Sequence, residues 1–468
     1  MFGWLGQLLR VNLTRGTIKT EPLEQGVART YLGGRGLGTY LHTKEVPAST
    51  KPLSAANNLI FATGPLTGTL APNGGRCALV AKGLPTGAIT AASIGGSWGP
   101  ELKFAGFDAI IFEGKAPEPV CLWITNGAAE LRSAGHLWGK TVAETTDLLR
   151  SEGNEKARVC CIGPAGENGV SFAVVVSAYS SAAGGAGIGA VMGFKNLKGV
   201  AVCGTQGFRV AAPGKFLGAA RDIRARIAAK PITCKGLKLN DSVLLAEGVG
   251  QDIGSSDGNS AMPHGCFSCS ARFSSFVVND GDVKSPLRDA SPAGNEVLRL
   301  TGDKQPDRVD GQLQQNGLFT DLGLDFVTMK TILASLSKEQ RGDELELARK
   351  MAHGGGVSQP STGWLEGPAM QAAEGGYPPT DHSGCVVDGY MMVPRILHYD
   401  GQQGADSASH WRALTAVVDS AVLCPYVLAV IDAGEIAALL SAATGIGYSS
   451  DDIVRVGERI AESSVIGE

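Results

Sequence analysis

Short runs of apolar and β-branched residues, separated by glycine, proline and asparagine, fill the first 208 positions of the chain. Such runs between turn-forming residues are typical of β-strands. One helix, over Thr141–Ser151, is the clearest interruption, so this region is predicted to be a β-rich domain with helical insertions. The predicted strands are Val11–Leu13, Leu59–Ala62, Cys77–Ala81, Ala109–Phe112, Val120–Thr125, Val159–Ile162, Phe172–Ser177 and Gly199–Cys203.

Helical patterns predominate after a linker at Val210–Pro213. The first predicted helix covers Gly214–Ala229, and an irregular polar stretch follows over residues 251–310. Near the C-terminus, apolar residues recur at steps of three and four, which buries one face of a helix; they are Leu414, Val417, Val418, Ala421 and Val422. The predicted fold class is α+β, with a β-rich N-terminal domain (1–208) followed by two mostly helical domains (209–350 and 351–468). No internal repeat is evident in the sequence.

Composition narrows the class of protein. The chain has 468 residues and a formal net charge of −4, which argues against a nucleic-acid binder, because such proteins concentrate Lys and Arg. No apolar run reaches the roughly 18 residues of a membrane span, and no basic region opens the chain as in a signal peptide. A chain of this length needs no disulfide framework for its 10 cysteines, so a cytoplasmic location is expected. The 65 glycines indicate many tight turns and close backbone approaches.

Three cysteines form a candidate metal site. Cys266 and Cys269 have Cys-x-x-Cys spacing, and Cys424 follows the predicted C-terminal helix. Such a pair places two thiolates on one tight turn, and a distant cysteine can complete the site from another element. The same residues could instead be ordinary thiols, with Cys424 packed as a small apolar side chain. The spacing alone leaves both interpretations open.

Glycine is concentrated in four segments, Leu32–Gly38, Gly64–Thr69, Ile94–Ser97 and Ala182–Gly193. Glycine lets backbone N–H groups converge on an anion, which suits phosphate or pterin recognition. Arg76 follows another glycine turn and could pair with a phosphate, or lie on the surface of a hairpin. Gly139–Thr141 resembles the end of a P-loop, but position 134 is Ala where that motif requires Gly, so this ATP-binding motif is excluded.

Together these segments resemble the aldehyde ferredoxin oxidoreductase family, tungsten-dependent enzymes with a bis-pterin cofactor and a nearby 4Fe–4S cluster. The motifs occur in the family's order over about the first 205 residues, and beyond that the resemblance thins to islands. The matching segments are Val11–Leu13, Leu32–Leu37, Gly64–Thr69, Glu101–Ile110, Gly163–Asn168 and Gly189–Lys198, followed by Cys266–Cys269, Leu322–Asp325, Asp419–Cys424 and Val456–Ile460.

The resemblance implies a cofactor site between the domains and a role for each retained residue. Arg76 would contact a pterin phosphate, and Ser93 and Ala182 would lie where Mg2+ links the phosphates of the two pterins. Gly95 would be a further cofactor-binding residue. The two pterin motifs would contribute Asp325, Asp419 and Leu423, and the carboxylates would accept hydrogen bonds from pterin amino groups. The residues implied to ligate the iron–sulfur cluster, as a 4Fe–4S or 3Fe–4S form, are Cys266, Cys269 and Cys424.

Several positions depart from the family pattern. Phe273 stands where a further cluster cysteine is expected, and Val386 stands where the proton-transfer histidine is expected. The partner glutamate is missing around Ala293–Asn295, which leaves Glu296 and His382 as the nearest catalytic candidates, and His264 as a possible fourth cluster ligand. The remaining departures are Thr320 and Val422 in the two pterin motifs, and Ser181 in place of an arginine.

Two functions from different classes follow. The first is an oxidoreductase that interconverts aldehydes and acids at tungsten or molybdenum and passes electrons to a ferredoxin or ferredoxin-like subunit, as a homo- or hetero-oligomer. The second is a catalytically silent paralogue that serves as a structural, assembly or electron-transfer subunit. A glycine-rich domain that binds an unrelated nucleotide ranks last, because no phosphate loop lies in a strand–helix context.

Overall fold

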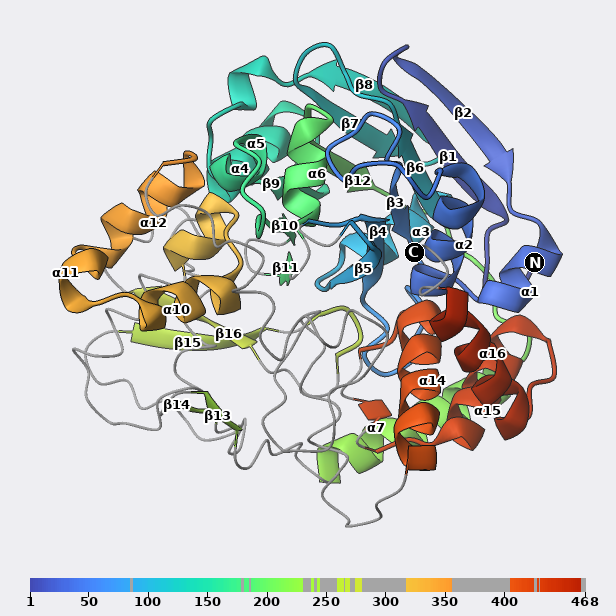
Figure 1. The fold of residues 1–468 in the computed structure, drawn as a ribbon. Helices are drawn as coiled ribbons and strands as arrows, with labels where there is room; N and C mark the ends of the chain where they lie inside the picture. Colours follow the sequence, from blue (N-terminus) through green and yellow to red (C-terminus); the bar gives the residue numbers. More distant parts are fainter. Residues whose placement is uncertain are drawn as a thin grey trace.

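The computed structural model of the chain describes residues 1–84, 87–177, 181–184, 187–229, 237–239, 242–244, 259–264, 266–269, 274–279, 317–355, 405–424, 427–428 and 430–463. Figure 1 shows the strands of two sheets in the upper part of the molecule, one group of helices at the left (α10–α12) and another at the lower right (α7 and α14–α16). The predicted α+β class is therefore confirmed.

The first sheet has six strands in the order β2-β1-β6-β3-β4-β5. The β1–β6 pair is parallel, and the other neighbours are antiparallel. Strands β3 and β4 are buried along their whole length, which explains their continuous apolar sequence. The strands are β1 (Gln7–Asn12), β2 (Thr17–Pro22), β3 (Leu59–Ala62), β4 (Cys77–Lys82), β5 (Ile89–Ile94) and β6 (Ala109–Glu113).

The second sheet repeats the topology of the first. Its order is β11-β10-β9-β12-β7-β8, with one parallel pair, β7–β12, in the place of β1–β6. The expectation of no internal repeat is therefore wrong at the level of topology, because the repeat lies in strand order and not in visible sequence identity. The strands are β7 (Val120–Thr125), β8 (Ala128–Ser133), β9 (Arg158–Ile162), β10 (Val175–Ser177), β11 (Ser181–Ala183) and β12 (Leu197–Cys203).

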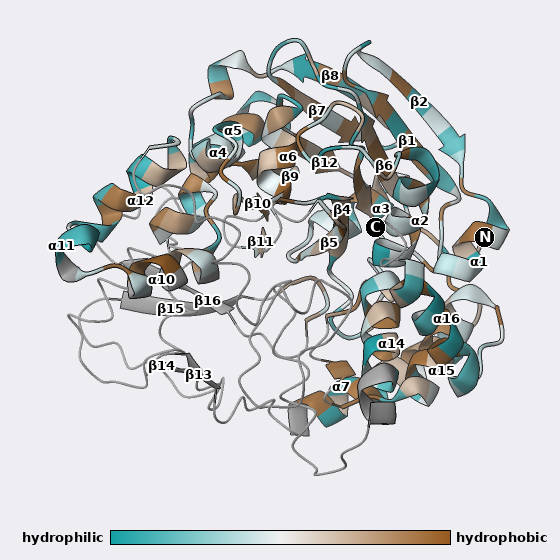
Figure 2. Cartoon of the chain, in the orientation of Figure 1, coloured by the Kyte–Doolittle hydropathy of each residue, from teal (hydrophilic) through white to brown (hydrophobic). Residues whose placement is uncertain are grey.

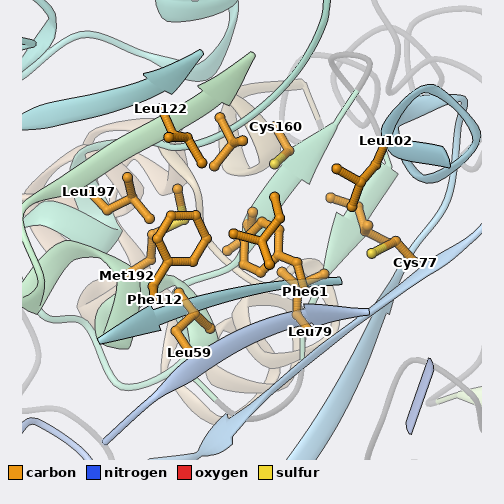
Figure 3. Packing of buried hydrophobic residues seen from close by; sticks show 14 of the residues in the cluster. Leu59, Phe61, Cys77, Leu79, Leu102, Phe112, Leu122, Cys160, Met192 and Leu197 are labelled. Atoms are coloured by element: carbon orange, nitrogen blue, oxygen red, sulfur yellow. The ribbon is translucent and has the colours of Figure 1, made fainter. Parts of the chain in front are cut away.

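The two sheets pack face to face around one apolar core. Phe61 and Phe112 from the first sheet meet Leu122 and Cys160 from the second (Figure 3), and all four side chains are buried. The rings of Phe61 and Phe112 lie edge to face, with centroids 5.5 Å apart, an arrangement that aromatic pairs prefer. This core holds the two halves of the repeat in a fixed relation to each other.

Helices fill equivalent places in the two halves. The helix α3 precedes β6 and α6 precedes β12, so each half ends in a strand–helix–strand unit. Thr141 and Glu144 form a capping box at the start of α4, the reciprocal arrangement that satisfies free N–H groups at a helix end. These helices are α1 (Gln25–Tyr31), α2 (Gly34–Glu45), α3 (Trp98–Phe104), the 3-10 helix η1 (Gly135–Leu137), α4 (Val142–Glu152), α5 (Pro164–Glu167) and α6 (Ile188–Phe194).

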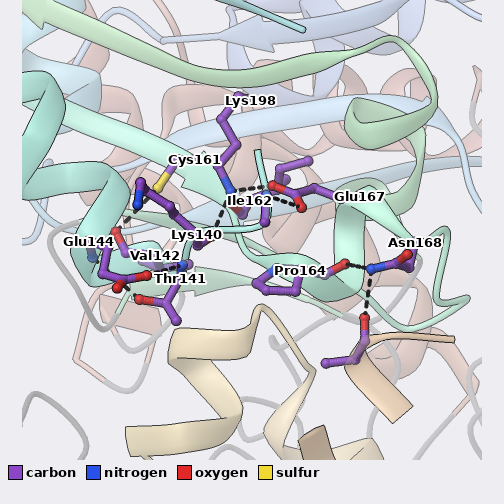
Figure 4. A network of polar contacts seen from close by, with 12 residues as sticks. Lys140, Thr141, Val142, Glu144, Cys161, Ile162, Pro164, Glu167, Asn168 and Lys198 are labelled. Atoms are coloured by element: carbon purple, nitrogen blue, oxygen red, sulfur yellow. Dashed lines mark hydrogen bonds and ion pairs between the residues drawn. The ribbon is translucent and has the colours of Figure 1, made fainter. Parts of the chain in front are cut away.

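A buried ion pair joins α5 to β12. Lys198 Nζ lies against Glu167 Oε1, and both side chains are almost fully excluded from solvent. The same Nζ donates to the carbonyl oxygens of Lys140 and Ile162, at 2.8 and 2.9 Å (Figure 4). Because every hydrogen of the ammonium has an acceptor, the desolvation of this charge is compensated.

One group of helices packs beside the first sheet. Helices α7 (Pro213–Ala229), α14 (Ala405–Ala421), α15 (Ala433–Thr444) and α16 (Ser450–Ser463) share an apolar core, to which Leu32 and Leu66 also contribute. In Figure 2 the central strands are mostly hydrophobic, whereas α16 is hydrophilic along one side. Among the helices that the structure describes, none is both long and apolar enough to cross a membrane.

The second group of helices lies against α5 and the second sheet. Phe319, Met329 and Leu347 pack with Val170 and Phe172, and Ala173 forms an isolated bridge with Leu324. The group contains α10 (Phe326–Ser335), α11 (Lys338–Arg341) and α12 (Glu344–Ala352). Two short hairpins complete the description, β13 (Leu237–Leu239) with β14 (Ser242–Leu244), and β15 (Asn259–His264) with β16 (Ser274–Asn279).

Thus α7 packs with the C-terminal helices and not with α10–α12, although both fall within the predicted middle domain. The domain boundaries at 208/209 and 350/351 stay predictions.

Candidate functional site

The equivalent edge strands of the two halves, β5 and β11, lie next to each other. A Cβ added to Gly95, at the end of β5, would lie 3.4 Å from Ser181 Oγ in β11. Ser93 and Ala182, which the sequence predicts near a Mg2+ site, therefore belong to neighbouring strands. The repeat places corresponding parts of its two halves around one point.

Asp325 reaches this region from the second helix group. Its Oδ1 accepts hydrogen bonds from the backbone N–H and the hydroxyl of Thr328, at 2.8 and 2.7 Å, so it caps the N-terminus of α10. A Cβ on Gly184, just after β11, would lie only 2.3 Å from Asp325 Oδ2, so only glycine leaves room for this carboxylate. Burial raises the pKa of the Asp325 carboxyl, because it disfavours the charged form.

Asp419 reaches the first half of the repeat from α14. Its Oδ2 lies 3.6 Å from Arg35 Nη1 and its side chain is almost fully buried. A Cβ on Gly34 would lie 2.2 Å from the backbone oxygen of Asp419, and one on Gly64 would lie 2.6 Å from that of Ser420. The end of α14 therefore packs directly on two of the glycine-rich segments. Leu423, which follows this helix, is also buried.

The Cys266–Cys269 turn lies against the glycines at the end of β5. The backbone N–H of Gly96 lies 3.1 Å from Cys266 Sγ, and the Gly96 carbonyl accepts from the Phe267 N–H at 2.9 Å. The turn closes through a 3.0 Å hydrogen bond from the Cys269 N–H to the Cys266 carbonyl. Hydrogen bonds to the cysteine sulfurs are among the contacts that tune an iron–sulfur cluster.

Asn73 connects this turn to Cys424. Its N–H donates to the Ser268 carbonyl at 2.9 Å, and its carbonyl accepts from the Cys424 N–H at 3.0 Å. The buried Asn73 therefore links Cys424 to the turn that carries Cys266 and Cys269, and each of the three cysteines is partly accessible.

Within the described ranges, no three His, Cys, Asp or Glu side chains are placed to hold one metal ion. The cysteines of an iron–sulfur cluster bind different iron atoms and need not converge on a single point. The separation of the three thiols is therefore compatible with the cluster that the resemblance implies.

Arg76 lies beside the same strands and is partly buried. Its Nε donates to Ser93 Oγ at 3.4 Å. The guanidinium is thus held between the glycine turn that ends at Gly75 and the strand β5, a position from which an anionic group at the strand ends could be bound bidentately.

The whole chain resembles one family in its sequence. It matches the model of the aldehyde ferredoxin oxidoreductase N-terminal domain over residues 8–204, and the model of domains 2 and 3 over residues 363–464. It is 33% identical to the tungsten-containing aldehyde ferredoxin oxidoreductase of Pyrococcus furiosus over 537 aligned positions, which cover 98% of this chain and 88% of that protein. The chain belongs to the aldehyde ferredoxin oxidoreductase family.

Other relatives show how far this family extends. An aliphatic sulfonate oxidoreductase, WOR-like subunit, of Pyrococcus furiosus is 38% identical over 221 positions, which cover 44% of this chain and 35% of that subunit. The solved active-site complex BamBC of benzoyl coenzyme A reductase with 1,5-dienoyl-CoA has the same fold, with a TM-score of 0.70 at 21% identity, and covers 99% of this chain and 88% of that one. Membership therefore fixes the fold and the general chemistry, and leaves the substrate open.

As a family member, the protein retains residues that fit a bis-pterin. Asp325 and Asp419 place carboxylates at the two halves of the repeat, and the glycines Gly184 and Gly34 allow Asp325 and the end of α14 to approach closely. Carboxylates are suitable acceptors for the amino groups of a pterin. Arg76 would hold a phosphate, and Ser93 and Ala182 would border the metal between the two halves.

Some departures from the family pattern can be located. Val422 adopts φ +64°, a backbone conformation that a β-branched residue rarely adopts and that the family's glycine accepts without strain. The backbone carbonyl of Thr320 accepts a hydrogen bond from the Gly323 N–H at 3.0 Å. This contact involves no atom of the Thr320 side chain. The other predicted positions lie outside the described residues, namely Phe273, Glu296, His382 and Val386, and nothing is described of the His264 side chain.

Sequence reasoning missed Asn73 and Gly184 as site residues. Asn73 lies in the glycine turn that precedes Arg76, and its φ of +60° is uncommon for most residues but less so for asparagine. The residues that it bridges are known only from the fold. Gly184 is one of several glycines in Ala182–Gly193, and no local signal separates it from its neighbours.

Proposed function

We propose that the protein is a tungsten- or molybdenum-pterin oxidoreductase that interconverts aldehydes and acids. The observation that carries this proposal is the juxtaposition of β5 and β11, since a repeat with paired edges suits a cofactor made of two equivalent halves. Each half has its own carboxylate, Asp325 or Asp419, supplied by a different helix group. When bound, the metallopterin supplies the two-electron chemistry, and the chain supplies position and charge.

We further propose that Cys266, Cys269 and Cys424 bind an iron–sulfur cluster of the 4Fe–4S or 3Fe–4S type. The contact of Cys266 with Gly95 and Gly96 supports this, because it brings a cluster ligand to the strand that would border a pterin. Electrons would leave through the cluster to a ferredoxin or ferredoxin-like subunit, in a homo- or hetero-oligomer. The free thiols of the described cysteines fit a cytoplasmic location.

Acid–base assistance is assigned to His382 and Glu296, the nearest substitutes for the family's histidine and glutamate. Such assistance is typically worth about 10²–10⁴ in rate, so turnover slower than that of other family members is expected, not complete inactivity.

A second candidate is a catalytically silent paralogue that acts as a structural, assembly or electron-transfer subunit. Val422, Thr320, Phe273 and Val386 favour it, because each replaces a family residue with one that lacks its chemistry or its backbone freedom. Iron without tungsten or molybdenum would identify an electron-transfer subunit, and folded protein without any of these metals would identify a structural or assembly subunit.

Metal analysis of protein purified anaerobically from its native host tests the proposal. About one tungsten or molybdenum with three or four iron atoms per chain is expected, followed by aldehyde oxidation with a low-potential acceptor. The variant Asp325→Asn should lose the pterin metal while it stays folded, since Asn also caps helices. The control is Asp343→Asn, which changes the exposed N-cap of α12 in the same way and should keep its metals.

A further inference from the structure

Arg224 extends from α7 to the turn that carries Cys266 and Cys269. Its Nη2 donates to the Leu70 carbonyl at 3.0 Å and also contacts Ser268 Oγ. Its Nε is buried and makes no hydrogen bond within the part of the chain that the structure describes. A half-buried guanidinium therefore stands beside the two cysteines and is bound to the residue between them.

Ser268 is held from two sides. Its carbonyl accepts from the Asn73 N–H, and its hydroxyl contacts Arg224. Its φ is +57°, a conformation that a non-glycine residue keeps only where its surroundings fix it. Because Ser268 lies between the two cysteines, its conformation sets the direction of both side chains.

The positive charge of Arg224 has different surroundings from that of Arg226. Arg226 forms an exposed ion pair with Glu435, whereas the Arg224 guanidinium contacts the neutral oxygens of Leu70 and Ser268. An arginine stays protonated at any physiological pH, and a partly buried charge is only weakly screened by salt. No ion pair joins Arg224 to another of the described residues, so within this part of the chain its positive charge beside the thiols is uncompensated.

We propose that Arg224 is a positioning residue of the iron–sulfur site that also raises its reduction potential. This inference rests on the proposed cluster. Arg224 holds the Cys266–Cys269 turn through Ser268. Its positive charge stabilises the reduced cluster, which is one unit more negative than the oxidised cluster. Net charge and hydrogen bonding near the sulfurs are general determinants of cluster potentials.

The test is a redox titration of the anaerobically purified protein, monitored by electron paramagnetic resonance. The iron content per chain is measured on the same samples. Arg224→Gln should shift the midpoint potential to a more negative value, and Arg224→Lys should restore most of the wild-type value. The matched control Arg226→Gln should leave the potential unchanged. Ser268→Ala keeps the charge of Arg224 but loses the contact, so it should lower iron retention with little shift in potential.

An unchanged potential in iron-replete Arg224→Gln would overturn the electrostatic role, and full iron retention in Ser268→Ala would overturn the positioning role. The second test holds even where Arg224→Gln does not fold. Wild-type protein without iron would instead overturn the proposed function, so the two failures are distinguishable.

Discussion

Lys195 is a charged residue in the interior of the N-terminal domain. Its side chain is fully buried, and its Nζ donates to the carbonyl oxygens of Gly114 and Ala55, at 2.8 and 3.4 Å. Burial lowers the pKa of Lys195 to about 7, although Glu113 acts in the opposite direction. The ordinary pKa of 10.5 applies to the unfolded chain, so this group links stability to pH.

The variant Lys195→Met should remove this linkage. Below about pH 7 the lysine is charged in both states and its burial destabilises the fold. From there to about pH 10 only the folded protein loses the proton, so the free energy of unfolding rises with pH. Relative to Lys195→Met, the wild type should gain roughly 2–3 kcal/mol between pH 6 and pH 9.

Urea denaturation at pH 6, 7.5 and 9 measures this difference. The exposed residue Lys19 on β2 supplies the control Lys19→Met, whose difference from the wild type should stay constant with pH. Parallel curves for wild type and Lys195→Met would contradict the assignment.

At the residue scale, the sequence indicates which residue types could carry chemistry, and the structure supplies their contacts. Cys266, Cys269 and Cys424 could be chosen because few residue types bind iron, and in the structure Asn73 links Cys424 to Ser268 in the turn between the other two. The space beside Asp325 could not be predicted, since Gly184 matters only because the fold brings α10 to the end of β11.

Close contact between backbones joins α14 to the N-terminal domain. The glycine-rich segments that the sequence predicts as ligand-binding loops also form contacts with α14. In one of them, the Gly36 N–H donates to Ser420 Oγ at 3.0 Å. Any side chain at Gly64 would meet backbone atoms of Ser420 and Ala421, within 2.7 Å. Because backbone cannot move as a flexible side chain can, such contacts tolerate no added atoms.

The variant Gly64→Ala should therefore displace the end of α14. Overpacking of this kind costs about 1–3 kcal/mol, and iron per chain should fall because Cys424 moves with the helix. Gly26→Ala is the matched control, since an added Cβ at that position of α1 meets nothing within 4 Å. Chemical denaturation and iron analysis of both variants measure these two effects. Equal iron content in the two variants would contradict the inference that the contact at Gly64 positions Cys424.

Most strands could be predicted from local sequence, and several helices could not. Leu59–Ala62 and Val120–Thr125 are strands as predicted, because their apolar runs match the buried interior of each sheet. The helix α2 was missed because it begins in the run Leu32–Gly38, and glycine is a poor helix former. Its packing against β4 and α14 overrides that preference.

At the scale of the whole molecule, the candidate site draws its residues from separate units. The repeat supplies β5 and β11, one helix group supplies Asp325, and the other supplies Asp419 and Cys424. A ligand that binds only this assembled form stabilises it by mass action. The repeat itself could not be predicted, because it is visible only in strand order.

Protein made without cofactor should consequently unfold at a lower temperature than protein from the native host. A fall of roughly 5 °C or more in the unfolding midpoint is expected from tight binding. Thermal scans under anaerobic conditions, with metal content measured on the same samples, test this expectation. Identical midpoints in samples that differ in metal content would argue against a site shared among the units.

The contacts of Asn73 with Ser268 and Cys424 also constrain when the centre can be built. A ribosome adds about 5–20 residues per second, so roughly 20–70 s separate the synthesis of Asn73 from that of Cys424. During that interval the nascent chain has the first half of its repeat but not the last cysteine. Insertion of the proposed cofactor is therefore expected during maturation of the nearly finished polypeptide, after the C-terminal helices have emerged.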